Sequence, residues 1–206
     1  MLAAALTLPT FFQAESHSES SPERTEPSDA DLVIATCRGD DDAFETLVRR
    51  HKRRVFGTAS RFARDDHQLD DLAQEIFVRV FRKLAQFRHD APFEHWLSRI
   101  TVSVCYDFLR KERRVRAQVA LDSVDHDLRD VGIDRAIAAG RAHELVAWAM
   151  SALTAEEQLI LTLCELEERP MKEVAQLTGW SESNVKVRAF RARNSLRKIL
   201  EDHHDS

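Results

Sequence analysis

The sequence is poor in the residues that break helices and in those that cross-link small folds. Its 206 residues include only five glycines, five prolines and three cysteines. So few glycines and prolines argue against many short strands and tight turns, and favour helices. Cys37, Cys105 and Cys164 are far apart and match no metal-ligand spacing, which excludes a disulfide framework and predicts reduced, mostly buried thiols. We therefore expect no metal and no cofactor.

Long hydrophobic runs are also absent. The apolar start, MLAAALTLPTFF, is too short to cross a bilayer, and no Lys or Arg precedes it as in a secretory signal. With 32% charged and 43% hydrophobic residues, the composition is that of a globular protein. We expect a cytoplasmic protein without membrane insertion. A targeting remnant and a misplaced initiation codon stay open as explanations of the apolar start.

The small net charge of −5 conceals long blocks of one sign. Residues 1–48 hold ten acidic residues against two basic ones, whereas residues 49–64 hold seven basic residues and no acidic one. Further basic blocks occupy 110–116 and 181–200. Because attraction to phosphates decays within about 8–10 Å, such blocks can serve a polyanion locally. Solvated helix faces are the alternative explanation of each block.

The periodicity of apolar residues predicts an all-α fold of two small helical domains. Residues 1–28 are predicted to be a disordered extension, because residues 13–28 are mostly Ser, Glu and Pro. A first domain, 29–115, is expected to hold helices over 29–37, 41–63, 69–87 and 93–115. An acidic, weakly periodic segment, 116–136, is predicted to be a flexible linker. The second domain, 137–202, is expected to hold helices over 138–152, from 155 to 162 or 166, over 170–177, and from the cap at Ser181 to about 201.

The last two helices match a helix-turn-helix. Thr178, Gly179 and Trp180 form the expected turn, and Ser181 is a typical cap for the helix that follows. Small and apolar residues recur on one stripe of that helix, and basic residues flank the stripe. Arg pairs well with guanine, Asn with adenine, and Val with the thymine methyl, so the outer face suits the major groove. An ordinary helical hairpin with a solvated basic face is the alternative.

Two further patterns precede the linker. Aromatic residues of 87–108 are interleaved with basic ones, which suits the stacking and phosphate contacts of single-stranded nucleic acid. Aromatics at helical spacing are more often core, so Phe87, Phe93 and Phe108 taken alone would be assigned to packing. In DDLAQEIFVRVFRKLAQF, the residues Asp71, Gln74 and Glu75 lie off the apolar stripe. A mixed exposed face of this kind suits a protein partner, although a solvated face is the default.

Taken together, these motifs resemble the extracytoplasmic-function sigma factors of bacterial RNA polymerase, which consist of sigma regions 2 and 4. The resemblance covers about Asp29 to Glu201 and rests on GDDDAFETLVRRHKRRV, DDLAQEIFVRVFRKLAQF, FEHWLSRITVSVCYDFLRKERR and the helix-turn-helix. It implies that the chain binds core RNA polymerase through the clamp helices and the flap, binds promoter DNA, and has an anti-sigma factor as a further partner. It also implies no enzymatic activity.

The resemblance further implies roles for particular residues. Contact with core polymerase falls on Asp71, Gln74 and Glu75. Opening and reading of the −10 element falls on Arg88, His89, Asp90, Phe93, Trp96, Arg99 and Ser103. Reading of the −35 element falls on Ser183, Asn184, Lys186, Val187, Arg188, Phe190 and Arg191. Members commonly carry Asn at the place of Ser103, and Gly-Thr and Ser at the places of Ser183-Asn184 and Val187, so no promoter sequence is carried over.

Two other functions are alternatives to this one. A free-standing helix-turn-helix regulator would bind duplex DNA without polymerase, but it would not need the aromatic loop or the face that carries Asp71. A helical metal-dependent hydrolase would use the His and Asp residues between His51 and Asp71. These acidic residues are compressed at one helix start, where they already offset the positive end of the helix dipole.

Overall fold

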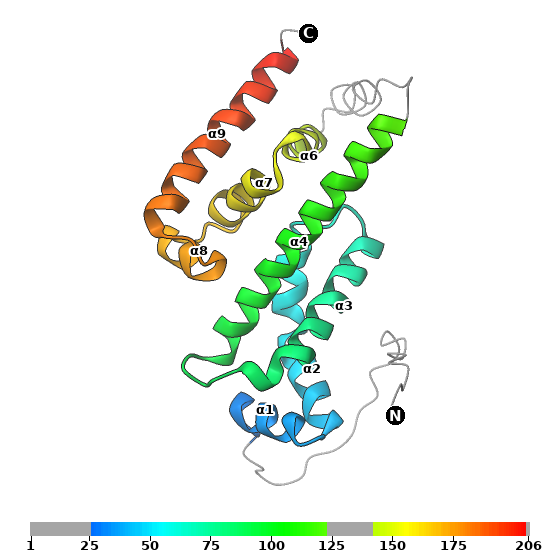
Figure 1. The fold of residues 1–206 in the computed structure, drawn as a ribbon, viewed down its shortest axis with the longest axis vertical. Coiled ribbons are helices and arrows are strands. Elements are labelled where there is room, and N and C mark those ends of the chain that lie inside the picture. The colour runs from blue at the N-terminus through cyan, green and yellow to red at the C-terminus, as the bar shows by residue number, and fades with distance from the viewer. Residues whose placement is uncertain (1–25, 123–141, 205–206) are drawn as a thin grey trace.

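The protein is all-α. The computed structural model describes residues 26–122 and 142–204, and no strand occurs within these ranges. The first range holds α1 (Asp29–Cys37), α2 (Asp41–Ala59), α3 (Asp66–Lys83), a 3₁₀ turn η1 (Leu84–Gln86) and α4 (Phe93–Asp122). The second holds α6 (Ala142–Ala152), α7 (Ala155–Leu161), a π-helical turn η2 (Thr162–Leu166), α8 (Met171–Thr178) and α9 (Glu182–His204), as Figure 1 shows.

Helices α1 to α4 form an N-terminal bundle around one apolar core. Its centre is made by large side chains that are at most 2% exposed, which recur at helical spacing on the facing sides of the helices: Leu47, Val55, Ile76, Val80, Leu97 and Val104. Burial of each such side chain contributes about 1.5–3 kcal/mol. The apolar stripe of α3 predicted from the sequence is therefore confirmed, and it turns the polar residues of α3 outward.

Helices α6 to α9 form a C-terminal bundle with its own buried residues. Leu159, Ile160 and Leu163 fill its centre from α7 and η2, and Val174 joins them from α8. Helix α9 meets them through Val185, Ala189 and Ala192, none of which is exposed. Because two of these three are alanines, the backbone of α9 can approach α7 and α8 closely.

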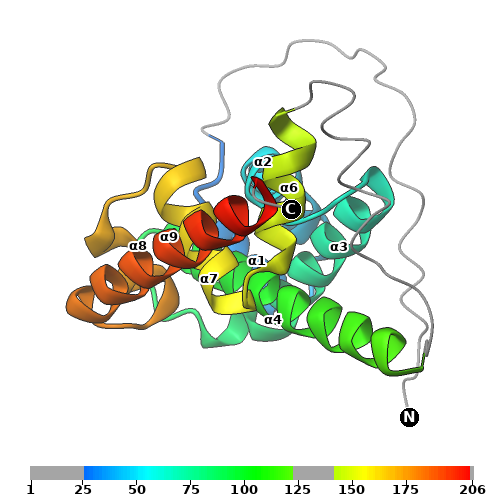
Figure 2. The ribbon, with the colours of Figure 1, turned by 90° about the horizontal axis from the view of Figure 1, so that it is seen from above.

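The two bundles pack against each other along α4. Helices α7 and α8 both contact α4, and the views of Figures 1 and 2 agree on this side-by-side placement. Arg113 donates from Nη1 to the carbonyl oxygen of Leu153, and Arg116 donates to that of Ser151 at 3.0 Å. Carbonyls at the end of a helix lack partners within it, so the two guanidinium groups cap the C-terminal end of α6.

Several helix ends differ from the sequence-based prediction. Helix α3 begins at Asp66 instead of 69, because the side chain of Asp65 accepts a hydrogen bond from the backbone of Gln68 and caps the helix. Helix α4 continues to Asp122 instead of 115, since residues 116–122 contain no glycine or proline. Residues 116–122 of the predicted linker are thus helical. The rest of the linker, residues 1–25 of the extension and the predicted helix start at 138 lie outside the described residues.

The cysteines are free, as predicted, but the expectation that they are mostly buried is wrong: Cys105 is buried, Cys164 is partly buried and Cys37 is exposed. Cys37 is exposed because it ends the short helix α1, whereas Cys105 lies in the middle of α4 and is 0% exposed. Burial raises the pKa of the Cys105 thiol, and the charge of Glu167 adds to this. Cys105 therefore stays protonated and packs as a small apolar side chain.

A capping box at the start of α7 generates the first prediction. Thr154 and Glu157 bond each other's backbone N–H groups, and Ser195 of α9 donates to Glu157 at 2.6 Å. Burial raises the pKa of Glu157, but these hydrogen bonds outweigh it, so the pKa lies below its ordinary value of 4.5. This stabilisation is complete above that value and is lost as the pH falls through the lower folded-state pKa.

We expect Glu157→Gln to lower the free energy of unfolding by about 0.5 kcal/mol near neutral pH, because glutamine can keep the capping-box geometry but loses the negative charge that strengthens these hydrogen bonds and interacts with the helix dipole. Urea unfolding of wild type and variant measures the difference, which should shrink as the pH falls below about 4.5, the ordinary pKa of this carboxyl. Glu45→Gln, on the exposed face of α2, is the control and should change little. A difference that stayed constant with pH would contradict the assignment.

Candidate nucleic-acid interface

The helix-turn-helix predicted from the sequence is confirmed. Helix α8 ends at Gly179, whose φ of 77° lies in the left-handed region that favours glycine. The hydroxyl of Ser181 then accepts a hydrogen bond from the backbone of Asn184 at 3.3 Å and caps α9. The chain therefore reverses between the two helices within three residues, and α9 starts with a fixed direction.

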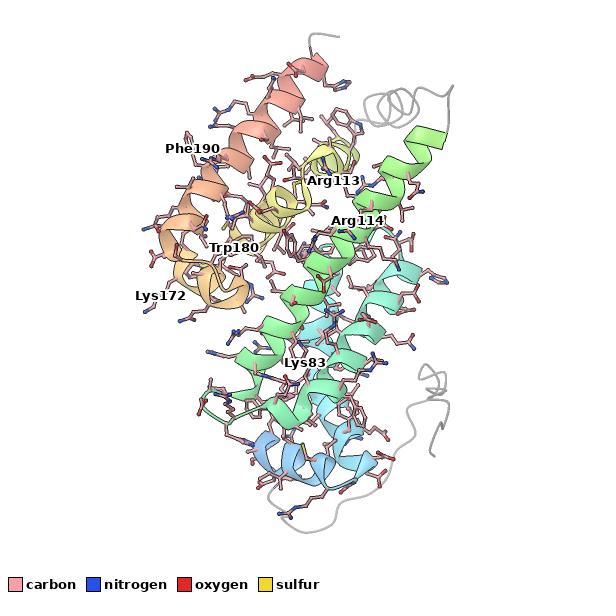
Figure 3. All side chains as sticks on the ribbon, in the orientation of Figure 1. Lys83, Arg113, Arg114, Lys172, Trp180 and Phe190 are labelled. Carbon is pink, nitrogen blue, oxygen red and sulfur yellow. The ribbon has the colours of Figure 1, made fainter. Side chains whose placement is uncertain are left out.

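The predicted −35 residues lie together on the outer part of α9. Since Val185, Ala189 and Ala192 face the core, the residues between them face away from it. Val187 is 47% exposed and Phe190 is 62% exposed, unusual values for apolar side chains, and Figure 3 shows Phe190 pointing away from the body of the protein. The other exposed members of the set are Ser183, Asn184, Lys186 and Arg191.

Arg188 differs from its neighbours because it is partly buried. Its Nε donates to the side-chain oxygen of Asn184 at 2.8 Å, and its Nη1 forms an ion pair with Glu156 of α7. Its guanidinium carbon also lies 4.4 Å from the centre of the Trp180 ring. Lys186, in contrast, forms an exposed ion pair with Glu182 one turn away. Sequence analysis did not foresee the role of Glu156, which comes from a helix about thirty residues upstream.

The loop between η1 and α4 carries the first of the predicted −10 residues. Arg88, His89 and Asp90 are all exposed, and His89 has a φ of 60°, a left-handed conformation that is costly for a residue with a side chain. The ring of His89 lies 4.5 Å from that of Phe87, which is buried under the loop. The loop thus projects polar side chains from a cluster of aromatic side chains.

This aromatic cluster of Phe87, Phe93 and Trp96 includes two residues that are predicted to contact the −10 element. The rings of Phe87, Phe93 and Trp96 lie 5.4 to 5.6 Å from one another. Phe93 is only 5% exposed and packs in the core against its neighbours, and its contact with DNA stays a prediction. Trp96 is partly exposed, and Arg99 and Ser103 follow it at helical spacing as exposed residues of α4.

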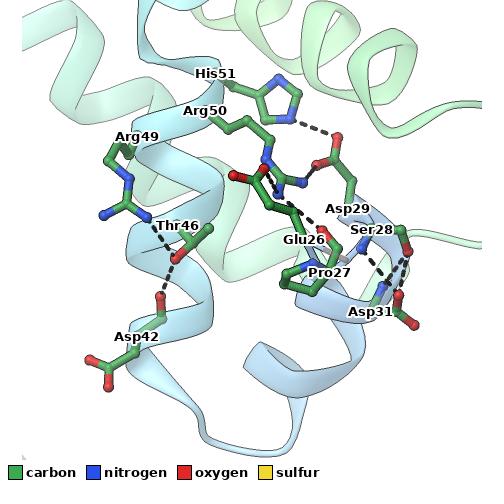
Figure 4. Close-up of polar contacts among 10 residues, drawn as sticks. All are labelled: Glu26, Pro27, Ser28, Asp29, Asp31, Asp42, Thr46, Arg49, Arg50 and His51. Atoms are coloured by element: carbon green, nitrogen blue, oxygen red, sulfur yellow. Dashed lines mark hydrogen bonds and ion pairs between the residues drawn. The ribbon is translucent and has the colours of Figure 1, made fainter. Parts of the chain in front are cut away.

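A buried polar contact lies next to this aromatic cluster, and the sequence did not predict it. His51 is 5% exposed, and its ring lies 5.2 Å from that of Phe93. Its Nε2 lies 2.8 Å from a carboxylate oxygen of Asp29, and Arg50 donates to the other oxygen at 2.7 Å (Figure 4). These contacts hold the start of α1 against α2, next to the aromatic cluster. The sequence signal was a histidine on the apolar stripe of a basic helix.

The predicted polymerase-contact residues form an exposed face on α3. Asp71, Gln74 and Glu75 are exposed, while Leu72 and Ile76 beside them are buried. Glu75 pairs with Arg79 at 2.9 Å, and Asp71 lies 3.4 Å from His67. The described residues contain no group of three or more His, Cys, Asp or Glu side chains that could hold a metal ion. No helix of the described ranges is long and apolar enough to span a membrane.

Two protein families match the chain. Sigma-70 region 2 matches residues 47–115, within the N-terminal bundle, and sigma-70 region 4 matches residues 143–196, within the C-terminal bundle. The second match contains α8, the turn and α9 up to residue 196, and the first contains both the α3 face and the aromatic loop.

Individual relatives cover most of the chain. The RNA polymerase sigma-H factor of Pseudomonas aeruginosa is 30% identical over 86% of this chain and 96% of its own length. The ECF RNA polymerase sigma factor SigM of Mycobacterium tuberculosis is 31% identical over 86% of this chain and 87% of its own. The solved structure of CnrH, in complex with the cytosolic domain of CnrY, is 26% identical, with a TM-score of 0.54 over 85% of this chain and 99% of that one. The chain therefore belongs to the extracytoplasmic-function sigma factors, which bind core RNA polymerase and direct it to promoter DNA for the initiation of transcription.

Proposed function

We propose a division of this activity among three surfaces of the chain. The N-terminal domain, 29–115, holds core polymerase with one surface and the −10 element with another, and the C-terminal domain, 137–202, reads the −35 element. The observation that carries the proposal is the outer face of α9, where Val187 and Phe190 are left exposed beside basic residues. Apolar exposure on a basic helix that is the second helix of a helix-turn-helix suits base edges in the major groove.

The α3 face is proposed to contact core polymerase at the clamp helices. Asp71 and Glu75 present carboxylates one helical turn apart, with the amide of Gln74 beside them. These carboxylates suit a basic partner, and their exposure means that binding needs no unfolding of the bundle. The face lies on α3, while the C-terminal bundle contacts α4, so docking of the two bundles leaves it open.

The loop of Arg88, His89 and Asp90, with the exposed side of α4 at Trp96, Arg99 and Ser103, is proposed to hold the opened −10 strand. Separated bases gain about 1–3 kcal/mol each from stacking on aromatic rings. The buried rings of Phe87 and Phe93 pack beneath this surface and hold the loop in a fixed place.

The proposal also covers the setting of the activity. The chain acts in the cytoplasm, where polymerase and promoter DNA are found, and it contributes binding without an enzymatic reaction of its own. The flap of core polymerase is proposed as a second contact, made by the C-terminal bundle. An anti-sigma factor is proposed as a regulatory partner, because the related CnrH was solved with part of a second protein, CnrY.

The test of −35 reading is Arg191→Ala. If Arg191 contacts a base, the change should cost about 1–3 kcal/mol of promoter binding and relax the preference at one position. Binding of the polymerase complex to a panel of −35 variants measures both effects. Arg193→Ala is the matched control, because Arg193 on the same helix pairs with Glu165 at 2.8 Å. Unchanged preference at every −35 position in Arg191→Ala would contradict the proposal.

The loop is tested on two templates. We expect Asp90→Ala and His89→Gly to impair transcription from a duplex promoter and to spare a template whose −10 region is already unpaired, since strand separation is then complete. Glycine is chosen at 89 because it adopts the φ of 60° without strain. Gln86→Ala, exposed in η1, is the control. Equal loss on both templates would rule out a role in opening.

The polymerase surface is tested by charge reversal. Asp71→Lys combined with Glu75→Lys should abolish binding to core polymerase and leave the melting temperature nearly unchanged, because both side chains are exposed. Glu45→Lys combined with Glu201→Lys makes the same change of charge at exposed sites on other helices and should bind normally. Affinity for core polymerase, measured by fluorescence anisotropy, decides: equal affinity of the two double variants would overturn the assignment.

A further inference from the structure

Arg188 is held on three sides, unlike the other basic residues of the outer face of α9. Asn184 accepts from Nε, Glu156 pairs with Nη1, and the ring of Trp180 covers one face of the guanidinium group. Its side chain is 26% exposed, whereas that of Lys186 is 62% exposed. An arginine without such contacts samples many rotamers, and fixing it on binding costs conformational entropy. Here that ordering has already taken place in the free protein.

The contacts leave donors for an outside acceptor. Arginine carries five N–H donors, of which Asn184 and Glu156 engage one each, on Nε and Nη1. Among the described residues the Nη2 group retains both of its donors, and Nη1 retains one. Recognition of guanine needs two neighbouring N–H donors directed at O6 and N7, and the three donors left on Nη1 and Nη2 are enough in number for such a pair.

The carboxylate of Glu156 is well placed to orient the guanidinium group. The capping box of Thr154 and Glu157 fixes the first turn of α7, and Glu156 lies between the two. A hollow of about 380 Å³ opens here, lined by Thr154, Glu156, Glu157, Asn184, Arg188 and Arg191. A carboxylate beside a DNA-binding face repels phosphates, so it weakens binding unless it contributes in another way. Fixing the direction of Arg188 is such a contribution.

Trp180 supplies the flat support for the same group. It lies in the turn of the helix-turn-helix, and its ring meets Tyr106 of α4 edge to face, with centroids 6.4 Å apart and planes at 87°. Figure 3 shows Trp180 in the turn next to α4, on the side of the C-terminal bundle that faces the N-terminal bundle. The stacking surface under Arg188 is thus anchored by a second domain as well as by its own turn.

We propose that Glu156 and Trp180 are positioning residues that hold Arg188 ready for one base pair of the −35 element and so determine specificity there. The proposal rests on the proposed reading of the −35 element by α9. Neither residue needs to touch DNA. Their loss is expected to reduce discrimination at one base pair, while total affinity changes little or even rises when the negative charge of Glu156 is removed.

The experiment compares Glu156→Gln with Glu182→Gln in complexes with core polymerase. Both variants remove one carboxylate near α9, but Glu182 pairs with Lys186 and does not contact Arg188. Binding to promoters that carry each of the four base pairs at each −35 position gives the discrimination ratios. We expect Glu156→Gln to lose roughly tenfold at the single position where Arg188→Ala also loses it, and Glu182→Gln to keep the ratio.

Trp180 is tested in the same assay by two changes. Trp180→Phe keeps an aromatic face and should retain most of the discrimination, whereas Trp180→Leu should lose it at the same position. Circular dichroism checks folding, and Glu156→Gln decides the question if Trp180→Leu unfolds. Full discrimination in Glu156→Gln, with or without a gain in affinity, would overturn the proposal. If Arg188→Ala itself leaves every ratio unchanged, the failure lies in the proposed function of Arg188 instead.

Discussion

The arrangement of the whole molecule depends on the burial of helix α4. One side of this helix supplies Leu97, Val104 and Leu109 to the core of the N-terminal bundle, each at most 3% exposed. Another side receives α7 and α8, so that the buried apolar residues of both bundles form one continuous cluster. At about 25 cal/mol per Å² of apolar surface removed from water, this burial is the main force that fixes both domains. The exposed surfaces can carry polar and strained groups because the packed core around α4 beneath them is rigid.

The candidate surfaces are built in the same way. In each of them a small number of exposed side chains lies over buried apolar side chains. The loop at His89 stands on Phe87 and Phe93, the outer residues of α9 stand on Val185 and Ala189, and the α3 face stands on Leu72 and Ile76. Preorganised support of this kind lowers the entropy that must be lost on binding.

The sequence predicted the helices and the exposed faces well, because both depend on local periodicity. The stripes of α3 and α9 and the cap at Ser181 follow from spacing alone. Contacts between segments that are far apart in the sequence could not be predicted from local periodicity. The pairs of Glu156 with Arg188 and of Asp29 with His51 join helices whose mutual placement no local pattern encodes. The end of α4 was missed for a related reason: an acidic composition suggested a linker, although nothing in residues 116–122 breaks a helix.

The capping of α6 by Arg113 and Arg116 has a consequence for how ionic strength acts on the molecule. The two guanidinium groups belong to the basic run 110–116, yet in this arrangement they are bonded to neutral carbonyl groups. Bonds to carbonyls involve no counterion, whereas a phosphate bound by the same groups would release condensed cations and be weakened by added salt. Domain docking through these two cations should therefore depend much less on salt concentration than the binding of a polyanion by the same groups would.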